Sequence, residues 1–146
     1  NQVVRGIEYE VSVTPVRNLN ITGNYTFLNG NDFVQSRVTT TDTAYSYLLR
    51  RPKHHINPNI GYQFSNGIYI ALQGKYLSKR FDVGGYRKAD VRLNDYFIAG
   101  AYAEYKWKKH IRFFADAQNI GNSRFTDLHG FNSMPFALHG GVTIDL

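Results

Sequence analysis

The stretch FIAGAYAEYKW, residues 97–107, decides the fold of this chain. Its odd positions, from Phe97 to Trp107, are all apolar, and its even positions from Gly100 on are small or polar. A period of two with one apolar side is typical of a β-strand and not of a helix. After the basic turn 108–110 the alternation resumes over 111–118, and it returns from Phe136 to Leu146. The C-terminal third therefore predicts three antiparallel strands.

The residue types on the two sides of these strands indicate which side meets water. The apolar side ends in Tyr105 and Trp107, next to the basic turn, and aromatic girdles of this kind are typical of outer-membrane barrels. The other side is polar and charged, as a water-filled lumen would be. A soluble barrel is built the other way round, with its apolar side packed inward. The pattern therefore favours the wall of a transmembrane barrel.

Composition narrows the classes of protein further. The chain has 146 residues and no cysteine, which argues against a disulfide scaffold or a thiolate metal site. A mean hydropathy of −0.39 and the lack of an 18-residue apolar run exclude a transmembrane helix but not a barrel. The net charge of +6 is spread over turns, loops and strand faces, so nucleic acid is not expected as a partner. The start at Asn1, without Met or a signal-peptide pattern, predicts a processed chain or a piece.

The rest of the chain adds four segments with the same alternation. They are expected at 3–14, 19–27, 47–64 and 68–76, which gives seven strands in all. Pro52 and Pro58, inside the third of these segments, predict a bulge or a late start to the strand pairing.

The connections between these strands alternate strictly in length. Short turns are expected near 15–18, 65–67 and 108–110, and long loops at 28–44, 81–94 and 120–135. Outer-membrane barrels place short turns at the periplasm and long loops outside. Bacterial single-chain barrels have an even number of strands, and open strand edges are not tolerated in lipid. Seven strands therefore predict part of a larger barrel.

Residues 48–146 resemble the C-terminal barrel of TonB-dependent outer-membrane receptors. The resemblance rests on Leu48-Leu49-Arg50-Arg51-Pro52-Lys53-His54, which opens a strand, on Phe113 to Asn122, and on Phe125 and Gly130-Phe131 in the last loop. Residues 3–27 are compatible with it. The Leu-Leu-Arg-Arg-Pro-Lys-His stretch looks most like the cobalamin receptor branch. The chain departs from the family in ending on Leu146, where an aromatic residue is common.

The resemblance implies active uptake of a scarce, bulky nutrient across the bacterial outer membrane. Cobalamin is the favoured ligand, with a ferric siderophore or haem next. In the family an N-terminal plug fills a 22-stranded barrel and a box before the plug binds TonB, and neither occurs in this sequence. Residues 1–146 would thus be the C-terminal segment of the barrel domain. The expected partners are the remaining strands and plug of the same receptor, TonB, outer-membrane lipid and lipopolysaccharide, and a surface lipoprotein.

In such a receptor the ligand is met by the long outer loops. Aromatic and Arg side chains suit a large, polar, partly conjugated ligand, although loop packing or lipopolysaccharide would use the same residues. No catalytic residue, metal or cofactor is expected. The aromatic residues of the strands are expected to form the membrane girdle, and the strand carboxylates to pair with Lys75, Lys106 or Arg112 in the lumen. The candidate ligand contacts are Arg80, Phe81, Tyr86, Arg87, Arg124, Phe125, His129 and Phe131; the girdle residues are Tyr9, Tyr25, Tyr76, Tyr105 and Trp107; the carboxylates are those of Glu8, Glu10, Glu104 and Asp116.

A small stand-alone outer-membrane barrel is the alternative, as a structural protein, an adhesin or a lipid-modifying enzyme. An enzyme of this kind would need a Ser with a partner His. Ser46, Ser78 and Ser123 have no His at a diagnostic spacing, and no H-x-x-x-H or G-x-S-x-G motif occurs. A stand-alone barrel also needs an eighth strand, which the pattern does not provide. The sequence therefore predicts a non-enzymatic protein.

Overall fold

The computed structural model describes residues 1–145, which form one large antiparallel sheet and a small two-stranded ribbon. Seven strands follow one another across the sheet in the order β1-β2-β4-β5-β8-β9-β10, and β3 extends the far end of β2. Residues 1–145 include no helix that is long and apolar enough to cross a membrane. The strands are β1 (Gln2–Val13), β2 (Leu19–Gln35), β3 (Asp42–Tyr45), β4 (His54–Gln63), β5 (Ile68–Leu77), β6 (Arg80–Asp82), β7 (Val91–Leu93), β8 (Tyr96–Trp107), β9 (Ile111–Gln118) and β10 (Ala137–Ile144).

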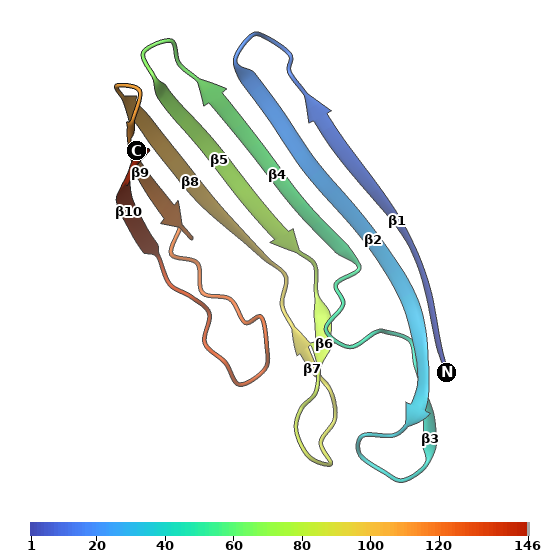
Figure 1. Ribbon diagram of the computed structural model, residues 1–146. Coiled ribbons are helices and arrows are strands. Elements are labelled where there is room, and N and C mark those ends of the chain that lie inside the picture. The colour runs from blue at the N-terminus through green and yellow to red at the C-terminus, as the bar shows by residue number, and fades with distance from the viewer. Residues whose placement is uncertain (146) are drawn as a thin grey trace.

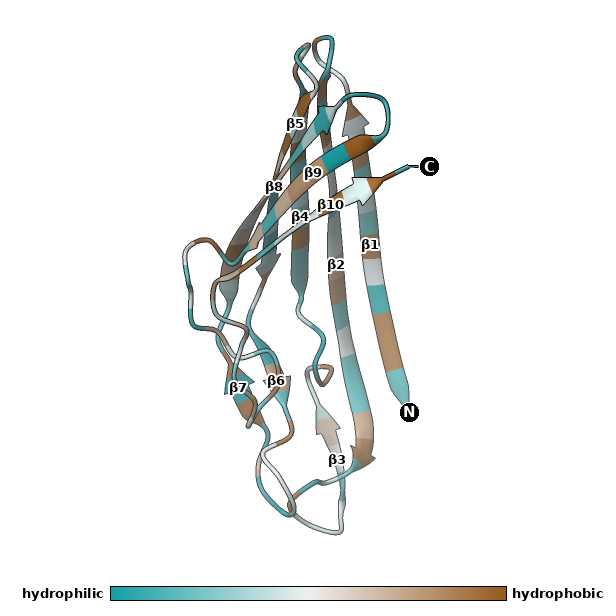
Figure 2. Cartoon of the chain, turned by 60° about the vertical axis from the view of Figure 1, so that its left-hand side comes forward, coloured by the Kyte–Doolittle hydropathy of each residue, from teal (hydrophilic) through white to brown (hydrophobic). Residues whose placement is uncertain are grey.

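The large sheet is curled into an open trough whose two free edges are β1 and β10 (Figures 1 and 2). Each of these strands pairs on one side only, with β2 and β9 respectively. The short turns lie together at one end of the trough and the long connections at the other. This arrangement confirms the all-β, antiparallel, up-and-down wall of seven strands. It also fits the expectation of a barrel segment, because the sheet stays open.

The strand register aligns the apolar side chains on the outer, convex side of the trough. One transverse row runs from Tyr9 through Tyr25, Ile56 and Tyr76 to Phe97, each residue directly opposite the next. Such cross-strand neighbours lie close enough to contact each other. Figure 2 shows the resulting bands of polar and apolar residues along the strands. The row lies toward the long connections, whereas Tyr105 and Trp107 lie near the short turns, so the outer face carries aromatic residues at two levels.

The apolar residues between these levels are open to the surroundings and not packed inside. Leu72 is 56% exposed and Val142 is 54% exposed, although both lie on long strands of the sheet. The few buried apolar residues gather instead where the long connections meet, and include Leu48, Leu77 and Leu93. An apolar convex face suits contact with lipid, because a soluble protein rarely exposes so large an apolar patch.

The first long connection differs from the expected loop at 28–44. Strand β2 continues to Gln35, and β3 folds back onto its end, with Asp32 opposite Tyr45 and Gln35 opposite Asp42. The next strand begins at His54, because Arg50 has a positive φ of 59° and Pro52 offers no N–H for pairing. The late start to pairing is thus confirmed for the segment predicted at 47–64.

The alternative to a late start, a bulge, does not occur at Pro58. The register between β4 and β5 is unchanged across this position, from Ile56 opposite Tyr76 to Asn59 opposite Gln73. Proline fits here because Gly74 lies opposite: a Cβ on Gly74 would stand 2.9 Å from the Pro58 ring. The missing side chain leaves space for the ring, so the strand accepts proline without an extra residue.

The other strand and loop boundaries differ less from the predicted ones. The loop predicted at 81–94 contains the β6–β7 ribbon, in which Arg80 pairs with Leu93. The last strand, β10, begins at Ala137, so Phe136 lies just outside it. Leu146 lies outside the described residues.

The lumen ion pairs expected on the concave face are not formed within residues 1–145. Glu104 instead accepts a hydrogen bond from the Tyr102 hydroxyl, 2.9 Å away on the same strand, and Asp116 accepts one from an amide group two residues further along β9. The register explains this result, because aromatic Tyr69 and Phe114 lie opposite Glu104 where a cation would be needed.

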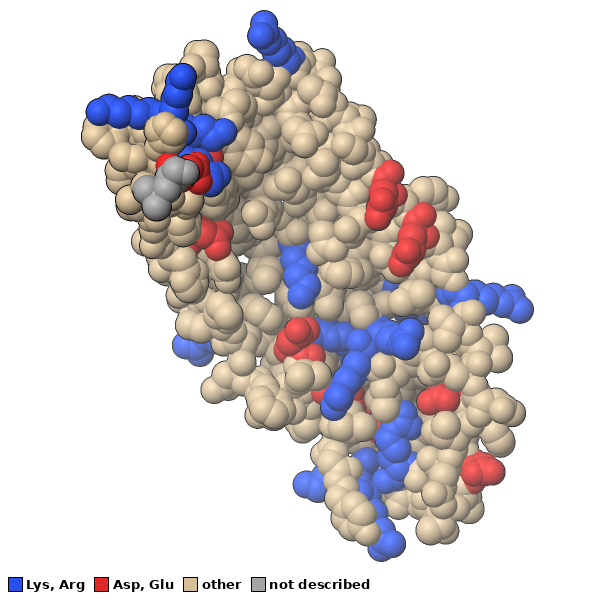
Figure 3. All heavy atoms as spheres, in the orientation of Figure 1, with Lys and Arg blue, Asp and Glu red and all other residues tan. Residues whose placement is uncertain are grey.

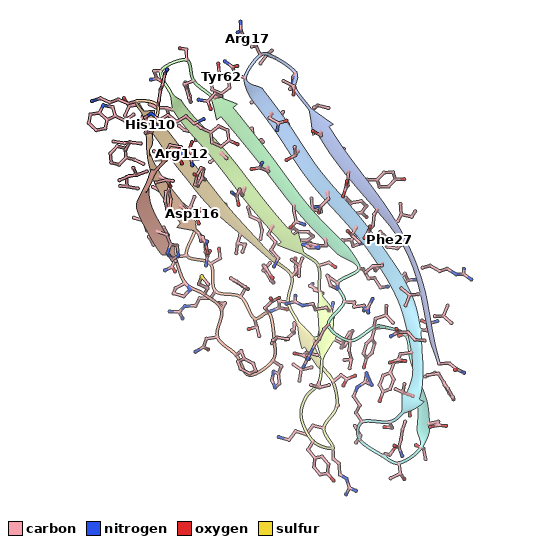
Figure 4. The ribbon with its side chains drawn as sticks, in the orientation of Figure 1. Arg17, Phe27, Tyr62, His110, Arg112 and Asp116 are labelled. Atoms are coloured by element: carbon pink, nitrogen blue, oxygen red, sulfur yellow. The ribbon has the colours of Figure 1, made fainter. Side chains whose placement is uncertain are left out.

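Arg112 forms an ion pair with Asp145, which follows β10; its Nη2 nitrogen lies 3.6 Å from the Asp145 Oδ1 oxygen. Figure 4 shows Arg112 and Asp116 on β9, and Arg17 and His110 at the end of the sheet that carries the short turns.

Candidate functional site

A cluster of basic side chains lies at the end of the trough where the long connections meet. It follows from the strand order: β4 begins and β5 ends at this end of the sheet, with His55 opposite Leu77. The residues just before β4 and just after β5 are therefore neighbours, and both segments are basic, at Arg51, Lys53 and Lys79. Figure 3 shows blue side chains gathered over this part of the face turned to the viewer.

These residues line a cavity of about 230 Å³. Its wall comes from β2, from the segment between β3 and β4, and from β6 and β7. A Cβ on Gly30 of β2 would meet the Leu48 side chain at 3.0 Å, so the segment after β3 packs directly over β2. The lining residues are Leu28, Asn29, Gly30, Tyr47, Leu48, Arg51, Lys53, Lys79, Arg80, Phe81 and Arg92.

The cavity is strongly positive. Five of its lining residues are cations, and in the described part of the chain no acidic residue lines it. Two of the five cations form ion pairs. The Arg80 Nη2 nitrogen is 2.7 Å from the Asp127 Oδ1 oxygen, and the Lys79 Nζ nitrogen is 4.0 Å from the Asp95 Oδ1 oxygen. Within residues 1–145 no carboxylate lies within 4.0 Å of the charged atoms of the other three, Arg51, Lys53 and Arg92. The cavity thus offers uncompensated positive charge to an anion.

Asp82 holds the walls of this cavity in place. Its side chain is 1% exposed and accepts hydrogen bonds from Arg50 Nε at 2.6 Å, from the Val83 N–H and from the His129 N–H, both at 2.8 Å. These donors come from three different connections, the segment before β4, the β6–β7 ribbon and the loop after β9. One buried carboxylate therefore joins all three.

Two further carboxylates strengthen the same assembly. Asp90 accepts a hydrogen bond from the Tyr47 hydroxyl at 2.7 Å and lies 3.2 Å from Arg37. Asp127 accepts hydrogen bonds from Arg80 and from the Tyr96 hydroxyl. The long connections are thus tied to each other and to the barrel strands.

Tyr47 and Phe81 form the aromatic part of the cavity wall. Their ring centroids are 3.9 Å apart and their planes differ by 18°, so the rings are stacked. Burial, followed by the hydrogen bond to Asp90, raises the pKa of Tyr47 to about 12. The hydroxyl therefore stays protonated at neutral pH and remains a donor to Asp90.

The eight residues predicted as ligand contacts do not come together in one place. Arg80 and Phe81 line the cavity. Tyr86, 87% exposed, and Arg87 lie at the tip of the β6–β7 ribbon, where they border a second hollow of about 480 Å³ beside the β2–β3 turn. Arg87 stacks over the Tyr86 ring at 5.5 Å.

The other four lie in the loop after β9. Phe125 packs on Tyr96 with ring centroids 4.3 Å apart, and the His129 N–H binds Asp82, so both positions support the loop structure. Arg124 is exposed, and Phe131 is 69% exposed. A ligand contact at each of these positions stays a prediction.

The sequence prediction missed four cavity cations and one aromatic residue. Arg51 and Lys53 belong to the sequence prediction only as part of the strand opening, and Tyr47, Lys79 and Arg92 are not among its candidate ligand contacts. A signal was available, because the basic residues before β4 and after β5 flank two strands joined by a tight hairpin. Antiparallel pairing brings the two flanks together.

A third and wider hollow lies on the concave face between β4, β5, β8 and β9. It has a volume of about 820 Å³ and is lined largely by polar side chains, among them Asn57, Gln73, Lys75 and Asp116. Within residues 1–145, no group of three or more His, Cys, Asp or Glu side chains is placed to hold a metal ion.

The sheet and its cavity define a class of protein: the wall of a membrane-spanning β-barrel with a basic mouth at the end that carries the long connections. The family model for the TonB-dependent receptor-like β-barrel matches residues 1–120. The chain therefore belongs to the TonB-dependent receptor β-barrel family, whose members lie in the bacterial outer membrane. No curated protein matches the chain significantly.

Solved structures of outer-membrane receptors share the fold. The siderophore receptor PiuA from Acinetobacter baumannii is 16% identical with a TM-score of 0.79, over 98% of this chain and 22% of that chain. The closed form of the ferric-catecholate import receptor Fiu from E. coli K12 is 17% identical with a TM-score of 0.78, over 98% and 21%. The ferripyoverdine receptor of Pseudomonas aeruginosa, bound to ferripyoverdine, is 14% identical with a TM-score of 0.77, over 99% and 20%. The chain thus spans about a fifth of the length of these receptors.

Proposed function

We propose that this chain forms part of the wall and the mouth of an outer-membrane receptor that imports ferric siderophores. The observation that carries the proposal is the basic cavity on the concave side, where five cations and no acidic residue of the described chain line one space. A ferric chelate held by catecholate or carboxylate groups carries net negative charge. Opposite charge at a water-filled mouth attracts such a ligand from a distance and raises its association rate.

The family and the fold support a siderophore as the ligand. The receptors compared above take up or bind siderophores, and one is an import receptor for ferric catecholates. The cobalamin preference drawn from residues 48–54 has no support from them. Charge also argues against it, because cobalamin is close to neutral overall and gains little from a cluster of cations. We therefore rank ferric siderophores first and haem, with its two carboxylates, second.

The proposal includes the partners that such a receptor needs. Strands β1 and β10 each present an unpaired edge, and further barrel strands of the same receptor would cover both. A plug domain would lie against the polar concave face, TonB would supply the energy, and lipid and lipopolysaccharide would surround the apolar convex face. The family is one of transport receptors, so we assign no reaction to the chain.

The test is iron uptake by the complete receptor that carries this sequence. It would be produced in an outer-membrane host lacking its own siderophore and haem receptors, with and without a functional TonB system. We expect radioactive iron to enter from at least one ferric siderophore only when TonB is functional. Labelled haem and labelled cobalamin would be offered in parallel. Uptake of either of these, with no uptake from any ferric siderophore, would contradict the proposal.

A further inference from the structure

The basic cavity has features that point to a narrower class of ligand. Resting on the proposed function, we propose that it is a subsite for one anionic arm of a ferric chelate, a catecholate or a carboxylate. The receptor would therefore select negatively charged chelates and discriminate against neutral or cationic trihydroxamates. The inference depends on the size of the cavity, on its charge and on the aromatic part of its wall.

The size of the cavity fits an arm and not a whole chelate. Its volume is about 230 Å³, below the roughly 300–1,000 Å³ of sites that enclose a drug-sized ligand. A water molecule takes about 30 Å³ of liquid, so the space holds on the order of ten non-hydrogen atoms. A dihydroxybenzoyl group or a citrate-type carboxylate arm is of this size.

The charge of the cavity determines the sign of that arm. Arg51, Lys53 and Arg92 have no carboxylate of residues 1–145 within 4.0 Å, so their charges are free to meet a ligand. Arg and Lys donate strong hydrogen bonds to anionic oxygens, and a planar guanidinium can bind two oxygens of one group. A cationic ferric trihydroxamate would meet like charges here, and a neutral one would gain no such bonds.

Arg80, which also lines the cavity, adds a fixed positive charge to its wall. Its side chain is 2% exposed, and the Nη2 nitrogen donates to the Thr126 and Asp127 carbonyls and to the Asp127 carboxylate. Within the described chain the other terminal nitrogen, Nη1, is buried without a hydrogen-bond partner. The guanidinium also lies 5.3 Å from the centroid of the Tyr96 ring, so it is turned toward β8 and the loop after β9. Its contribution to the cavity is therefore its charge, and the ligand contacts are assigned to Arg51, Lys53 and Arg92.

The stacked pair of Tyr47 and Phe81 favours a flat, conjugated arm. These rings form part of the cavity wall, where a catecholate ring could extend the stack. A carboxylate arm would use only the cations. The two chemistries share the anionic oxygens, and the test below separates them.

The test measures binding to the purified complete receptor in detergent. Gallium(III) replaces iron to avoid redox chemistry, and the probes are its complexes with a tris-catecholate, with citrate and with a linear trihydroxamate. We expect the tris-catecholate or the citrate complex to bind at least tenfold more tightly than the trihydroxamate complex, and this preference to shrink as salt increases. Tight tris-catecholate binding with weak citrate binding would assign the aromatic arm, and the reverse would assign the carboxylate arm.

Three variants test whether the cavity causes this preference for anionic chelates. Arg51→Gln, Lys53→Gln and Arg92→Gln each remove a cation without an ion pair among the described residues, so we expect normal yield in the outer membrane. Each variant should weaken binding of the anionic probe by about tenfold, because a hydrogen bond between charged groups is lost. Lys109→Gln, in the short turn at the opposite end of the sheet, is the matched control and should leave binding unchanged.

The failures of the two proposals are distinguishable. Equally tight binding of the trihydroxamate complex, or binding that none of the cavity variants affects, would overturn the anionic subsite while leaving siderophore uptake in place. If the cavity variants change only the lipopolysaccharide that copurifies with the receptor, the cavity binds a lipid phosphate and the subsite is also overturned. If no ferric chelate of any class binds or enters, the proposed function itself fails.

Discussion

At the scale of single residues, Asp82 joins three connections at the mouth of the trough. Replacing it with Asn keeps the shape of the side chain but removes the negative charge next to Arg50. It also replaces one of the two acceptor oxygens by an NH2 group, which would then face the N–H of His129 or Val83 and could not accept its hydrogen bond. We expect Asp82→Asn to destabilise the loop assembly by about 1–3 kcal/mol. Hydrogen exchange at the His129 and Val83 amides should speed up.

The control for this variant is Asp42→Asn in β3. Asp42 is exposed and makes no side-chain hydrogen bond or ion pair within residues 1–145, so its loss of charge should leave the same amides protected. Unchanged protection in Asp82→Asn itself would contradict the role of Asp82 as the joint between the three connections.

The ionisation of Asp82 gives a prediction about pH. Burial disfavours the charged form, but the hydrogen bonds from Arg50, His129 and Val83 outweigh it and hold the pKa of Asp82 below its ordinary value of 3.8. The stabilisation is therefore complete above pH 3.8 and is lost as the pH falls through the lower folded-state pKa. Amide protection at His129 should persist at pH 4 and decline only in stronger acid. Protection that already declines near pH 6 would contradict this account.

At the scale of elements, the two faces of each strand predict opposite responses to charge. Leu72 and Gln73 are neighbours on β5, but Leu72 lies on the convex face whereas Gln73 lines the polar hollow. Leu72→Arg should destabilise the complete receptor in a bilayer by about 2–4 kcal/mol. Gln73→Arg is the matched variant and should change the free energy of unfolding little. Equal effects in both variants would mean that the convex face does not meet lipid.

The strand pattern also shows how far sequence reasoning could go. The membrane-spanning parts of the strands were predictable, because lipid on one face and water on the other enforce a period of two over residues such as 97–107. The pattern fails beyond the membrane, where both faces meet water. In residues 28–35 of β2 the apolar and polar residue types do not alternate for this reason, although the exposure of the side chains does. The β6–β7 ribbon is held by the packing of Arg80 and Asp82 and not by a repeat.

The candidate site was predictable only in part. Arg80 and Phe81 were identified from their residue types in a long connection. Arg51, Lys53 and Arg92 become neighbours through the hairpin register and the folding back of β7, which residue types alone do not reveal. The fit of Pro58 in a central strand was not predictable, because the compensating Gly74 lies sixteen residues away in the sequence, on the adjacent strand.

At the scale of the whole molecule, the unpaired edges of β1 and β10 determine how the isolated segment behaves. The outer edges of β1 and β10 each leave backbone N–H and C=O groups without strand partners in residues 1–145, and lipid offers none. We therefore expect residues 1–146 produced alone to associate through these edges when refolded in detergent. Light scattering coupled to size-exclusion chromatography should show oligomers or aggregates, whereas the complete receptor should stay a closed particle. A stable monomer would contradict the account of the chain as a barrel segment.

The length of β2 has a practical consequence. Its 17 residues span about 56 Å at roughly 3.3 Å per residue, against a hydrocarbon core of about 30 Å. Even when tilted, this strand carries the β2–β3 turn well clear of the lipid, and Val38 to Thr41 in that turn are exposed. A peptide epitope inserted between Thr39 and Thr40 should therefore be displayed on living cells. Antibodies to it would allow receptor molecules at the cell surface to be counted without breaking the membrane.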